Sequence, residues 1–495
     1  MTQPSNEVYA AIALSRFGLG ADSNGVAAIA SDPRGALREE ITERFVPVPV
    51  GVELKPTADL LVALYDFQEQ RKQARAQPVA VAAPPVTTSQ GPQPAMSGGD
   101  MKAGQPGRSA PMPKAMASPP PPAAAYLPQQ VFLAEAEARF NGTIRQPLIG
   151  FGERLAMFWA NHFAVSTSSG EEVHILAGAF EREAIRPHVF RRFSDMLLAV
   201  ETHPAMLTFL DNRQSIGPDS KANAKGKRGL NENLARETLE LHTLGVDGGY
   251  TQADVTTLAR IITGWTVVRG QSPLGASGTF AFNANAHEPG DQTLLGLTYA
   301  DHGFGQGREA LHDLSRHPAT ARHIATKLVR HFVSDVPPPA LVEKLSATYS
   351  KTDGDLSAVY LALLGSDEAW DPKLVKIRSP LEFVIALLRA SGEKPKPNVI
   401  VGALAAMGQP FWAPSGPNGF PDTVDAWASG QGLSTRMDVA NTIANAAPPQ
   451  VDPRRFVSDS LGPLLSDETL RAVSRAETRS QGLAIAYLSP EFQRR

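Results

Sequence analysis

Residues 231–245, NENLARETLELHTLG, and residues 251–265, TQADVTTLARIITGW, decide the fold of this sequence, because both have the apolar spacing of amphipathic helices. Asn231 is a favoured N-cap residue for the first helix. Thr251 and Asp254 have the spacing of a capping box before the second. Because glycines separate the two stretches, the sequence predicts two helices joined by a turn, with the second helix continuing to the end of its stretch.

The first of these helices is expected to carry its polar side chains on one face. At about 100° per residue, Asn233, Glu237 and Glu240 form one row, and Arg236 lies in the adjoining row. Two carboxylates in register beside a guanidinium and an amide favour a polar cleft for acid–base chemistry or cation binding. A solvated surface with weak intrahelical ion pairs fits the same spacing. His242 falls on the apolar side, so this helix alone gives poor geometry for a metal site.

Three other places supply candidate site residues. His162 lies on the apolar face of a helix expected over 153–163, where a histidine is more often a core residue than a ligand or base. His287 lies in a polar turn over 283–292. Trp412 lies in the aromatic, proline- and glycine-rich segment 407–428, which is typical of a pocket wall or of rings packed over a helical core. The candidates are Glu237, Glu240, Arg236 and His162 for catalysis, and Asn231, Asn233, His287 and Trp412 for ligand binding.

Composition limits the chemistry that this chain can carry. Its 495 residues include no cysteine, which excludes disulfides, thiolate zinc sites, iron–sulfur clusters and cysteine nucleophiles. The net charge of −3 gives no support to a nucleic-acid partner or an anionic membrane surface. No apolar run is long enough to span a bilayer, and no signal-peptide pattern occurs at the N-terminus. The sequence therefore predicts a cytoplasmic protein, and leaves open a periplasmic location or export with a partner.

Helical periodicity covers most of the chain and predicts a mainly α protein with a multi-helix single core. Residues 1–75 are expected to pack as an N-terminal helical segment on a main helical domain over 127–495. Between them, residues 76–126 are rich in proline, alanine and glutamine and poor in core-forming side chains, which predicts a disordered insertion. Two short apolar runs joined by residues 283–292 predict one small β-hairpin over about 279–299.

A helix that begins at Pro318 is expected to run to Val333 and to have a basic side. Such a side binds an anion or pairs with an acidic face, and we expect it to pair with the acidic face of residues 232–240. The basic side carries His323, Lys327, Arg330 and His331.

Several stretches together resemble the bacterial family known as domain of unknown function 1800. The resemblance covers nearly the whole chain apart from the proline-rich insertion. It implies a mostly helical bacterial protein without an assigned reaction, and a co-encoded partner from the family known as domain of unknown function 1501. Many members are exported, whereas this chain shows no signal, and the family brings no established catalytic residues. The stretches are FWANHF at 158–163, the block 231–265, HPATA at 317–321, residues 376–389, MGQP at 407–410 and SPEFQRR at 489–495.

Two functions from different classes fit these observations. The first is a polar cleft around the 231–242 helix that binds or processes an unknown ligand, with cation-assisted hydrolysis as the least constrained reaction. The second is a non-catalytic scaffold or chaperone-like partner of the co-encoded protein. The sequence contains no recognised motif for a nucleophile, a phosphate loop, a dinucleotide or a metal pair, and it names neither a cofactor nor a metal.

Overall fold

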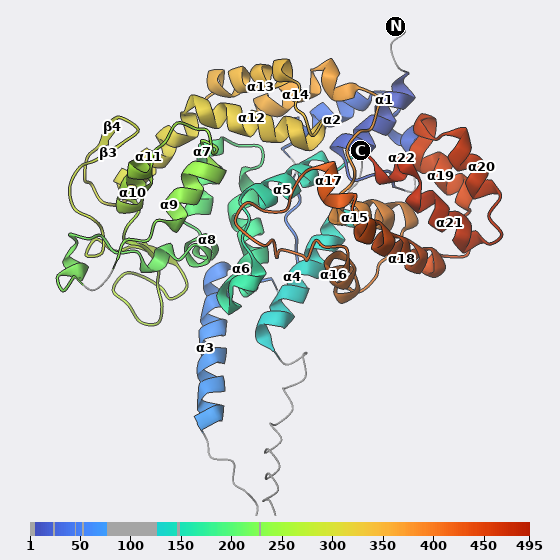
Figure 1. Ribbon diagram of the computed structural model, residues 1–495. Coiled ribbons are helices and arrows are strands. Elements are labelled where there is room, and N and C mark those ends of the chain that lie inside the picture. Colours follow the sequence, from blue (N-terminus) through green and yellow to red (C-terminus); the bar gives the residue numbers. More distant parts are fainter. Residues whose placement is uncertain are drawn as a thin grey trace, which may run out of the picture.

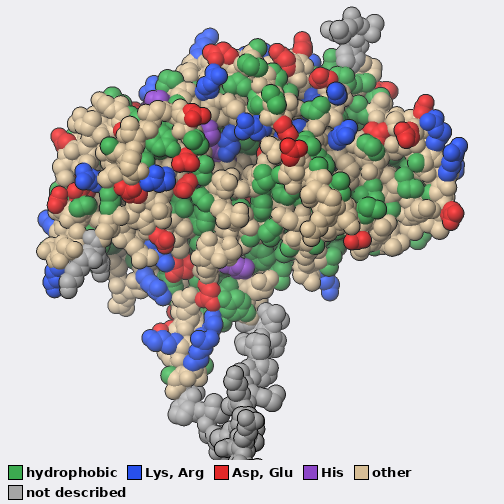
Figure 2. Space-filling view, in the orientation of Figure 1, with side chains coloured by type: hydrophobic (Ala, Val, Ile, Leu, Met, Phe, Trp, Pro, Cys, Tyr) green, Lys and Arg blue, Asp and Glu red, His purple; other side chains and the backbone are tan. Residues whose placement is uncertain are grey.

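The computed structural model of the protein is built mainly from helices (Figure 1), which confirms the expected fold class. Acidic and basic side chains are mixed over the face shown in Figure 2. The proline-rich insertion expected over 76–126 lies outside the described residues except at its two ends. The structure describes residues 5–22, 25–44, 46–51, 54–76, 126–145, 149–226 and 229–495.

The first helices gather around α5, in the middle of the molecule (Figure 1). Helices α3 and α4 both pack along α6, and α3 projects below the body of the protein. The bounds are α1 Asn6–Ile12, α2 Pro33–Thr42, α3 Thr57–Ala76, α4 Leu127–Ile144, α5 Phe151–His162, α6 Glu171–Phe180, α7 Phe193–Glu201 and α8 Pro204–Phe209.

The block that decides the fold forms two helices as expected, with one difference in the first. Helix α9 covers Asn233–Glu237, and the chain then continues as a wider π-helical turn over Thr238–His242. The capping box predicted at Thr251 is confirmed at the start of α10. The N-cap predicted at Asn231 is wrong by one residue, because α9 begins at Asn233 and Glu232 is its N-cap. Asn231 Oδ1 nevertheless accepts a hydrogen bond from the backbone N–H of Asn233. The bounds that follow are α10 Gln252–Ile261, α11 Phe304–Arg316, α12 Pro318–Phe332, α13 Pro339–Lys351 and α14 Leu356–Leu364.

Two β-hairpins occur where the sequence predicts one. Strand β1, Trp265–Val267, pairs antiparallel with β2, Phe280–Phe282, and β3, Gln292–Leu294, pairs with β4, Leu297–Tyr299. The expected pairing across residues 283–292 is therefore wrong. The physical reason lies at residues 295 and 296, whose φ values of 50° and 82° make a two-residue turn of the kind that matches strand twist.

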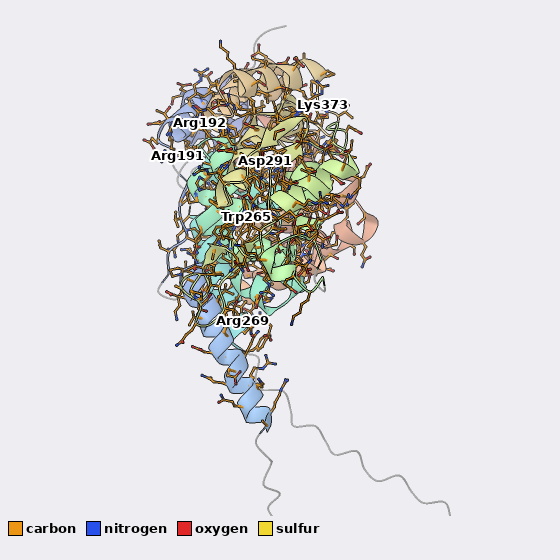
Figure 3. All side chains as sticks on the ribbon, turned by 90° about the vertical axis from the view of Figure 1, so that its left-hand side faces the viewer. Arg191, Arg192, Trp265, Arg269, Asp291 and Lys373 are labelled. Carbon is orange, nitrogen blue, oxygen red and sulfur yellow. The ribbon has the colours of Figure 1, made fainter. Side chains whose placement is uncertain are left out.

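The second predicted helix also ends earlier than its apolar spacing indicates. Helix α10 stops at Ile261, and Gly264 follows with φ of 80°. Trp265 then lies in β1 with its indole completely buried against α11, close to Gly307 (Figure 3). Just beyond β1, the guanidinium of Arg269 stacks on the ring of Tyr65 in α3 at 4.5 Å. A buried aromatic ring thus fits strand and helix spacing equally, and only its tertiary partners distinguish the two.

The C-terminal third continues as helices, of which α15 and α16 pack against α4 while α18, α19 and α20 pack against α21 (Figure 1). Helix α15 begins with the capping box that the sequence predicts, in which Ser379 and Glu382 bond each other's backbone N–H groups behind Pro380. The bounds are α15 Pro380–Ser391, α16 Pro397–Ala406, α17 Val424–Trp427, α18 Gly430–Ala446, α19 Pro453–Leu461, α20 Asp467–Ser474, α21 Arg479–Leu488 and α22 Pro490–Gln493.

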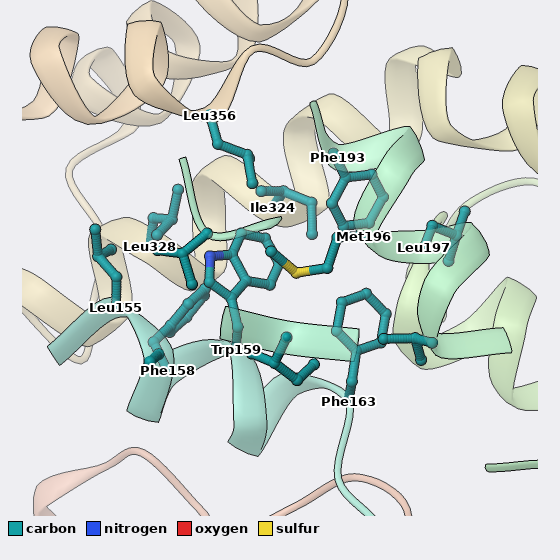
Figure 4. Packing of buried hydrophobic residues seen from close by; sticks show 14 of the residues in the cluster. Leu155, Phe158, Trp159, Phe163, Phe193, Met196, Leu197, Ile324, Leu328 and Leu356 are labelled. Atoms are coloured by element: carbon teal, nitrogen blue, oxygen red, sulfur yellow. The ribbon is translucent and has the colours of Figure 1, made fainter. Parts of the chain in front are cut away.

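Trp159 of α5 lies at the centre of the larger hydrophobic cluster, among Met196 of α7 and Ile324 and Leu328 of α12 (Figure 4). Its indole N–H donates to the hydroxyl oxygen of Tyr360 at 2.7 Å. This bond satisfies a polar group that would otherwise be costly to bury. Helix α5 therefore positions its remaining side chains from a fixed point in the core.

A smaller hydrophobic cluster is formed by α4, α15 and the helices that follow α15. Trp412, in the segment between α16 and α17, packs against both clusters. The two clusters therefore meet around this segment. Across the ranges that the structure describes, no helix combines the length and the apolar character needed to cross a membrane.

Replacing Leu328 by alanine tests this packing. Leu328 is completely buried, so removing its side chain should leave a cavity and destabilise the fold by about 2–5 kcal/mol. Leu361→Ala is the matched control, because Leu361 lies on α14 with 41% of its surface exposed and should change stability by less than about 0.5 kcal/mol. Thermal unfolding midpoints measure both variants, and equal midpoints would contradict the assigned core.

Candidate functional site

A cleft of about 350 Å³ lies where α5, α12, the start of α15 and the segment 409–423 come together. Its walls are largely apolar, and its charged side chains come from two buried ionic groups and from α12. The apolar side chains include Met157, Phe158, Val165, Leu381, Leu404, Phe411, Trp412, Phe420 and Pro421. The polar side chains are Arg139, Asn161, His162, Glu181, Lys327, Arg330, His331, Ser379, Glu382, Gln409, Asn418, Asp422 and Thr423.

Helix α5 forms one side of the cleft with the last turns of its sequence. Phe158 and His162 are four residues apart and therefore share a face of the helix. Asn161 fastens the opposite wall, because its Oδ1 accepts from the N–H of Phe420 at 2.8 Å and its Nδ2 donates to the Phe420 carbonyl at 2.9 Å. Gly419 passes so close to Asn161 that an added Cβ would lie 2.3 Å from its carbonyl oxygen.

The segment 409–423 is the wall that its aromatic and proline-rich composition predicts. The carbonyl of Trp412 accepts from the N–H of Thr167 at 2.8 Å, and that of Pro414 accepts from the Ser166 hydroxyl at 2.7 Å. Gln409 accepts from the N–H of Leu381 at 2.8 Å. The segment is therefore fixed to two helical regions along its length, which gives the cleft a preformed shape.

Arg139 and Glu181, which line the cleft, belong to a buried group of two acids and two arginines. Arg186 contacts Glu153 at 2.6 Å and Glu181 at 2.5 Å, and Arg139 contacts the same two carboxylates at 3.2 and 3.3 Å. The second oxygen of Glu181 also accepts the indole N–H of Trp412 at 3.1 Å. Burial would raise the pKa of Glu153, but Arg186 and Arg139 lower it to about 2.

Three other lining residues, His331, Glu382 and Asp422, belong to a second buried group. We call this group the Glu382 network: Arg154, His331, Glu382, Asp422 and Arg495. Glu382 forms salt bridges with Arg154 at 2.7 Å and Arg495 at 2.9 Å. Arg495 also reaches Asp422 at 3.1 Å. His331 connects Asp422 to Arg154, since its Nδ1 forms a hydrogen bond with Asp422 at 2.6 Å and its Nε2 accepts a hydrogen bond from Arg154 at 3.1 Å. Five separated parts of the chain thus meet in one set of polar and ionic contacts.

The pKa values in the Glu382 network follow from burial and pairing. Burial would raise the pKa of Glu382, but Arg154 and Arg495 lower it to about 2. Burial would likewise raise the pKa of Asp422, whereas its contacts with His331 and Arg495 hold it well below its usual range. Burial lowers the pKa of His331 to about 4, so its imidazole is neutral near pH 7. Both acids are therefore ionised and already paired.

Lys327 and Arg330 differ from the other charged groups of the cleft. Both lie on α12 and line the cavity. Within the described residues, neither side chain has a hydrogen bond or a salt bridge. Burial lowers the pKa of Lys327 to about 8; Asp422 opposes this and Arg330 adds to it. The cleft therefore contains two cationic side chains that no protein group neutralises by direct contact.

The sequence pattern placed Lys327 and Arg330 on the basic side of this helix, but the partner predicted for that side is wrong. Pairing between the basic side of α12 and the carboxylates of residues 232–240 is not found among the salt bridges of the described residues. Glu232 instead pairs with Arg236 at 3.3 Å, and Glu240 accepts from the Tyr250 hydroxyl at 3.2 Å. His323 of α12 bonds the Leu241 carbonyl at 3.1 Å. The two helices thus meet through a side-chain contact with a backbone carbonyl, and Lys327 and Arg330 of α12 line the cleft.

Two of the candidate residues named from the sequence line this cleft. His162 is 1% exposed, and its Nε2 lies 3.2 Å from the carbonyl oxygen of His242. Burial lowers its pKa well below the usual value, and Lys327 and His323 add to this effect. Trp412 lines the opposite wall. The structure thus brings together residues separated by 250 positions.

The polar face of the 231–242 helix lies outside this cleft, because none of Arg236, Glu237 and Glu240 lines it. Burial raises the pKa of Glu237, while His242 opposes this shift. Arg236 also donates to Gln252 at 3.0 Å. Asn233 is exposed. Their assignment to a functional site stays a prediction.

The remaining two candidates lie apart from the cleft. Asn231 lines a separate, more polar hollow formed by residues 213–216, Gly264 and the chain after β2. His287 is 6% exposed, with Nδ1 3.1 Å from the Thr263 carbonyl and Nε2 3.6 Å from Asp301. These contacts hold the loop between the two hairpins, and binding roles for both residues stay predictions.

A buried imidazole–carboxylate pair was missed by the sequence analysis. Nδ1 of His242 lies 2.7 Å from Oε1 of Glu201 in α7, and both side chains are almost completely buried. His242 Nε2 and Glu201 Oε2 have no hydrogen-bond partner among the described residues. Helical spacing placed His242 on the apolar side but gave no sign of Glu201, which comes from another helix.

Metal ligation was a second possibility raised by the carboxylates and histidines. Among the residues that the structure describes, no group of three or more histidine, aspartate or glutamate side chains has an arrangement suited to a metal ion. The three acids that line the cleft, Glu181, Glu382 and Asp422, instead form salt bridges with arginines.

Comparison with known proteins identifies the family. The family model described as protein of unknown function (DUF1800) matches residues 12–494. The chain therefore belongs to the DUF1800 family, as its sequence stretches indicate. It matches no curated protein and no solved structure.

Glu382→Gln tests the Glu382 network. Since the pKa of Glu382 is lowered from 4.5 to about 2, its ionised form stabilises the fold above pH 4.5, and this contribution is lost as pH falls toward 2. The variant should lose about 3–5 kcal/mol at pH 7, because Arg154 and Arg495 keep a buried charge without its partner. Unfolding midpoints between pH 7 and pH 2 measure the effect.

The difference between wild type and Glu382→Gln should shrink as the pH falls through this window. Glu343→Gln is the control, because Glu343 is 72% exposed in a surface pair with Arg322 and should change little. A difference that stayed constant from pH 7 to pH 2 would show that the charge of Glu382 does not stabilise the fold.

Proposed function

We propose that the protein binds a small organic anion with an apolar body in the cleft between α5, α12 and the segment 409–423. The apolar part of the ligand lies against Phe158, Phe411 and Trp412. Its negative group lies at Lys327 and Arg330. Processing of this ligand is compatible with the proposal, but the binding step is what the geometry supports.

The observation that carries the proposal is the charge balance of the cleft. The negative charge of Glu181 is already neutralised by its salt bridges with Arg139 and Arg186. The negative charges of Glu382 and Asp422 are neutralised by salt bridges with the arginines of the Glu382 network and with Lys376. Two cations remain on α12 after these pairs are formed. Cations without a partner in a partly buried, largely apolar site favour an anion, because desolvation strengthens the attraction.

The dimensions and walls of the cleft suit a small molecule. A volume of about 350 Å³ lies at the lower end of the range for small-molecule sites, which runs from roughly 300 to 1,000 Å³. The rings of Phe411 and Trp412 are 4.1 Å apart, and together they present a continuous apolar surface. A ligand with one ring and one acidic group fits both properties.

The proposal keeps a role for the 231–242 helix but moves the ligand away from the carboxylates of that helix. That helix supports the cleft through His242, whose carbonyl oxygen lies within hydrogen-bonding distance of His162. Its carboxylates do not line the cavity. We therefore assign the helix a positioning role for His162, and we place the ligand on the other side of that histidine.

Arg330→Gln tests the proposal with 4-methylbenzoate as the anionic probe and 4-methylbenzamide as its neutral match. Loss of the guanidinium should weaken 4-methylbenzoate binding by about 1.5–3 kcal/mol, which is roughly one to two powers of ten in Kd. Binding of the amide should change little. Isothermal titration calorimetry measures all four combinations of protein and probe.

Arg322→Gln is the matched control on the same helix, because Arg322 is 66% exposed and lies outside the cleft. It should bind 4-methylbenzoate as the wild type does. If Arg330→Gln and Arg322→Gln had equal effects, or if the wild type preferred the amide, the cleft would not be an anion site.

A further inference from the structure

We propose that Lys327 forms a Schiff base with a carbonyl group on the ligand of this cleft. The proposal rests on the proposed function and deepens it, because it names the ligand class as an aldehyde or ketone that also carries an acidic group. Arg330 is then the fixed cation that holds the acid, and Lys327 is the nucleophile beside it.

The geometry of two neighbouring lysines shows why Lys327 is the reactive one. Lys376 is 2% exposed at its side chain and is fully engaged, with Asp335 at 2.7 Å, Asp422 at 3.2 Å and the Asp422 carbonyl at 2.7 Å. Lys327 lines the cavity, and its amine has no such partner within the described residues. One lysine is therefore structural, whereas the other presents a free amine to the cleft.

The surroundings of Lys327 favour the neutral amine. Burial lowers its pKa to about 8, Asp422 opposes the shift, and Arg330 reinforces it. His162 of α5 and His323 of α12 also face it. Both imidazoles are neutral near pH 7, because burial lowers their pKa values, so neither adds a positive charge. A usable fraction of unprotonated lysine then exists near neutral pH, as a nucleophile requires.

The chemistry needs no further reactant. The unprotonated Nζ attacks the carbonyl carbon and a C–N bond forms, while the electrons of the carbonyl π bond move to the oxygen, which takes one proton from the nitrogen and becomes a hydroxyl group. The resulting carbinolamine loses this hydroxyl together with the remaining nitrogen-bound proton as one water molecule, which leaves a C=N bond between Lys327 and the ligand. Apolar walls favour the step, because they keep bulk water away from a bond that hydrolyses easily.

The experiment traps this bond in the full-length protein. The probe is 4-carboxybenzaldehyde, which carries a ring, a carboxylate and an aldehyde, and sodium cyanoborohydride reduces the imine to a stable amine. Intact mass and peptide mapping locate the added group. Modification at Lys327 should be about tenfold or more faster at pH 7 than at Lys351, an exposed lysine at the end of α13, because the lowered pKa of Lys327 leaves more of its amine unprotonated.

The pH profile and two variants complete the test. The trapping rate at Lys327 should rise through about pH 8 and then level, and near neutral pH it should exceed the rate at Lys351. Lys327→Arg keeps the charge but should reduce fast trapping to the level of surface lysines, and Lys351→Arg should leave it unchanged. Thermal unfolding confirms that both variants fold. If Lys327→Arg does not fold, peptide mapping on the wild type decides alone.

Binding of 4-methylbenzoate to the wild type separates this inference from the proposed function. This probe has the ring and the carboxylate but no carbonyl group that can form an imine. If it binds and Lys327 is trapped no faster than Lys351, the Schiff-base inference is wrong and the anion site stands. If neither binding nor preferential trapping occurs, both proposals fail.

Discussion

The Glu382 network is the interaction on which the rest of this structure depends. A carboxylate and a guanidinium removed from water are each costly, and the cost is met only when their contacts are nearly complete. Glu382 therefore requires Arg154 from α5 and Arg495 from the C-terminus, and Asp422 requires His331 from α12. These contacts join the larger and the smaller hydrophobic clusters at their boundary. They also fix the end of the segment that forms one wall of the cleft.

The same constraint determines which charges in the cleft are available for a ligand. A buried acid that holds the fold together cannot also serve as a base, because its oxygens are occupied and its pKa is low. Glu181 and Glu382 are in this position. Lys327 and Arg330 are not part of either buried group, although they lie only one helical turn or less from His331. Helix α12 thus carries one residue of the Glu382 network, His331, and separately the two cations that we propose for ligand binding.

Local sequence signals predicted the parts of the fold that depend on neighbouring residues. The capping boxes at Thr251 and Ser379 and the helix start at Pro318 all form as expected, since their hydrogen bonds close within one turn. The hairpin pairing and the end of α10 at Ile261 were missed. A short apolar run fits several pairings, and the choice among them depends on a packing partner distant in the sequence. Trp265 shows this, because α11 decides its environment.

For the site, the sequence by itself determined the kinds of side chain and their place on each element. It put His162 on an apolar helix face, Trp412 in a wall-forming segment and a row of cations on α12, and the structure has all three. Only the tertiary structure decided which of these side chains meet and which charges remain unpaired. A charge is neutralised by the side chains that lie next to it in the folded protein, and these come from distant parts of the sequence. Glu181, Glu382 and Asp422 each find their cations on other elements, and what those pairings leave over is the positive charge of the cleft.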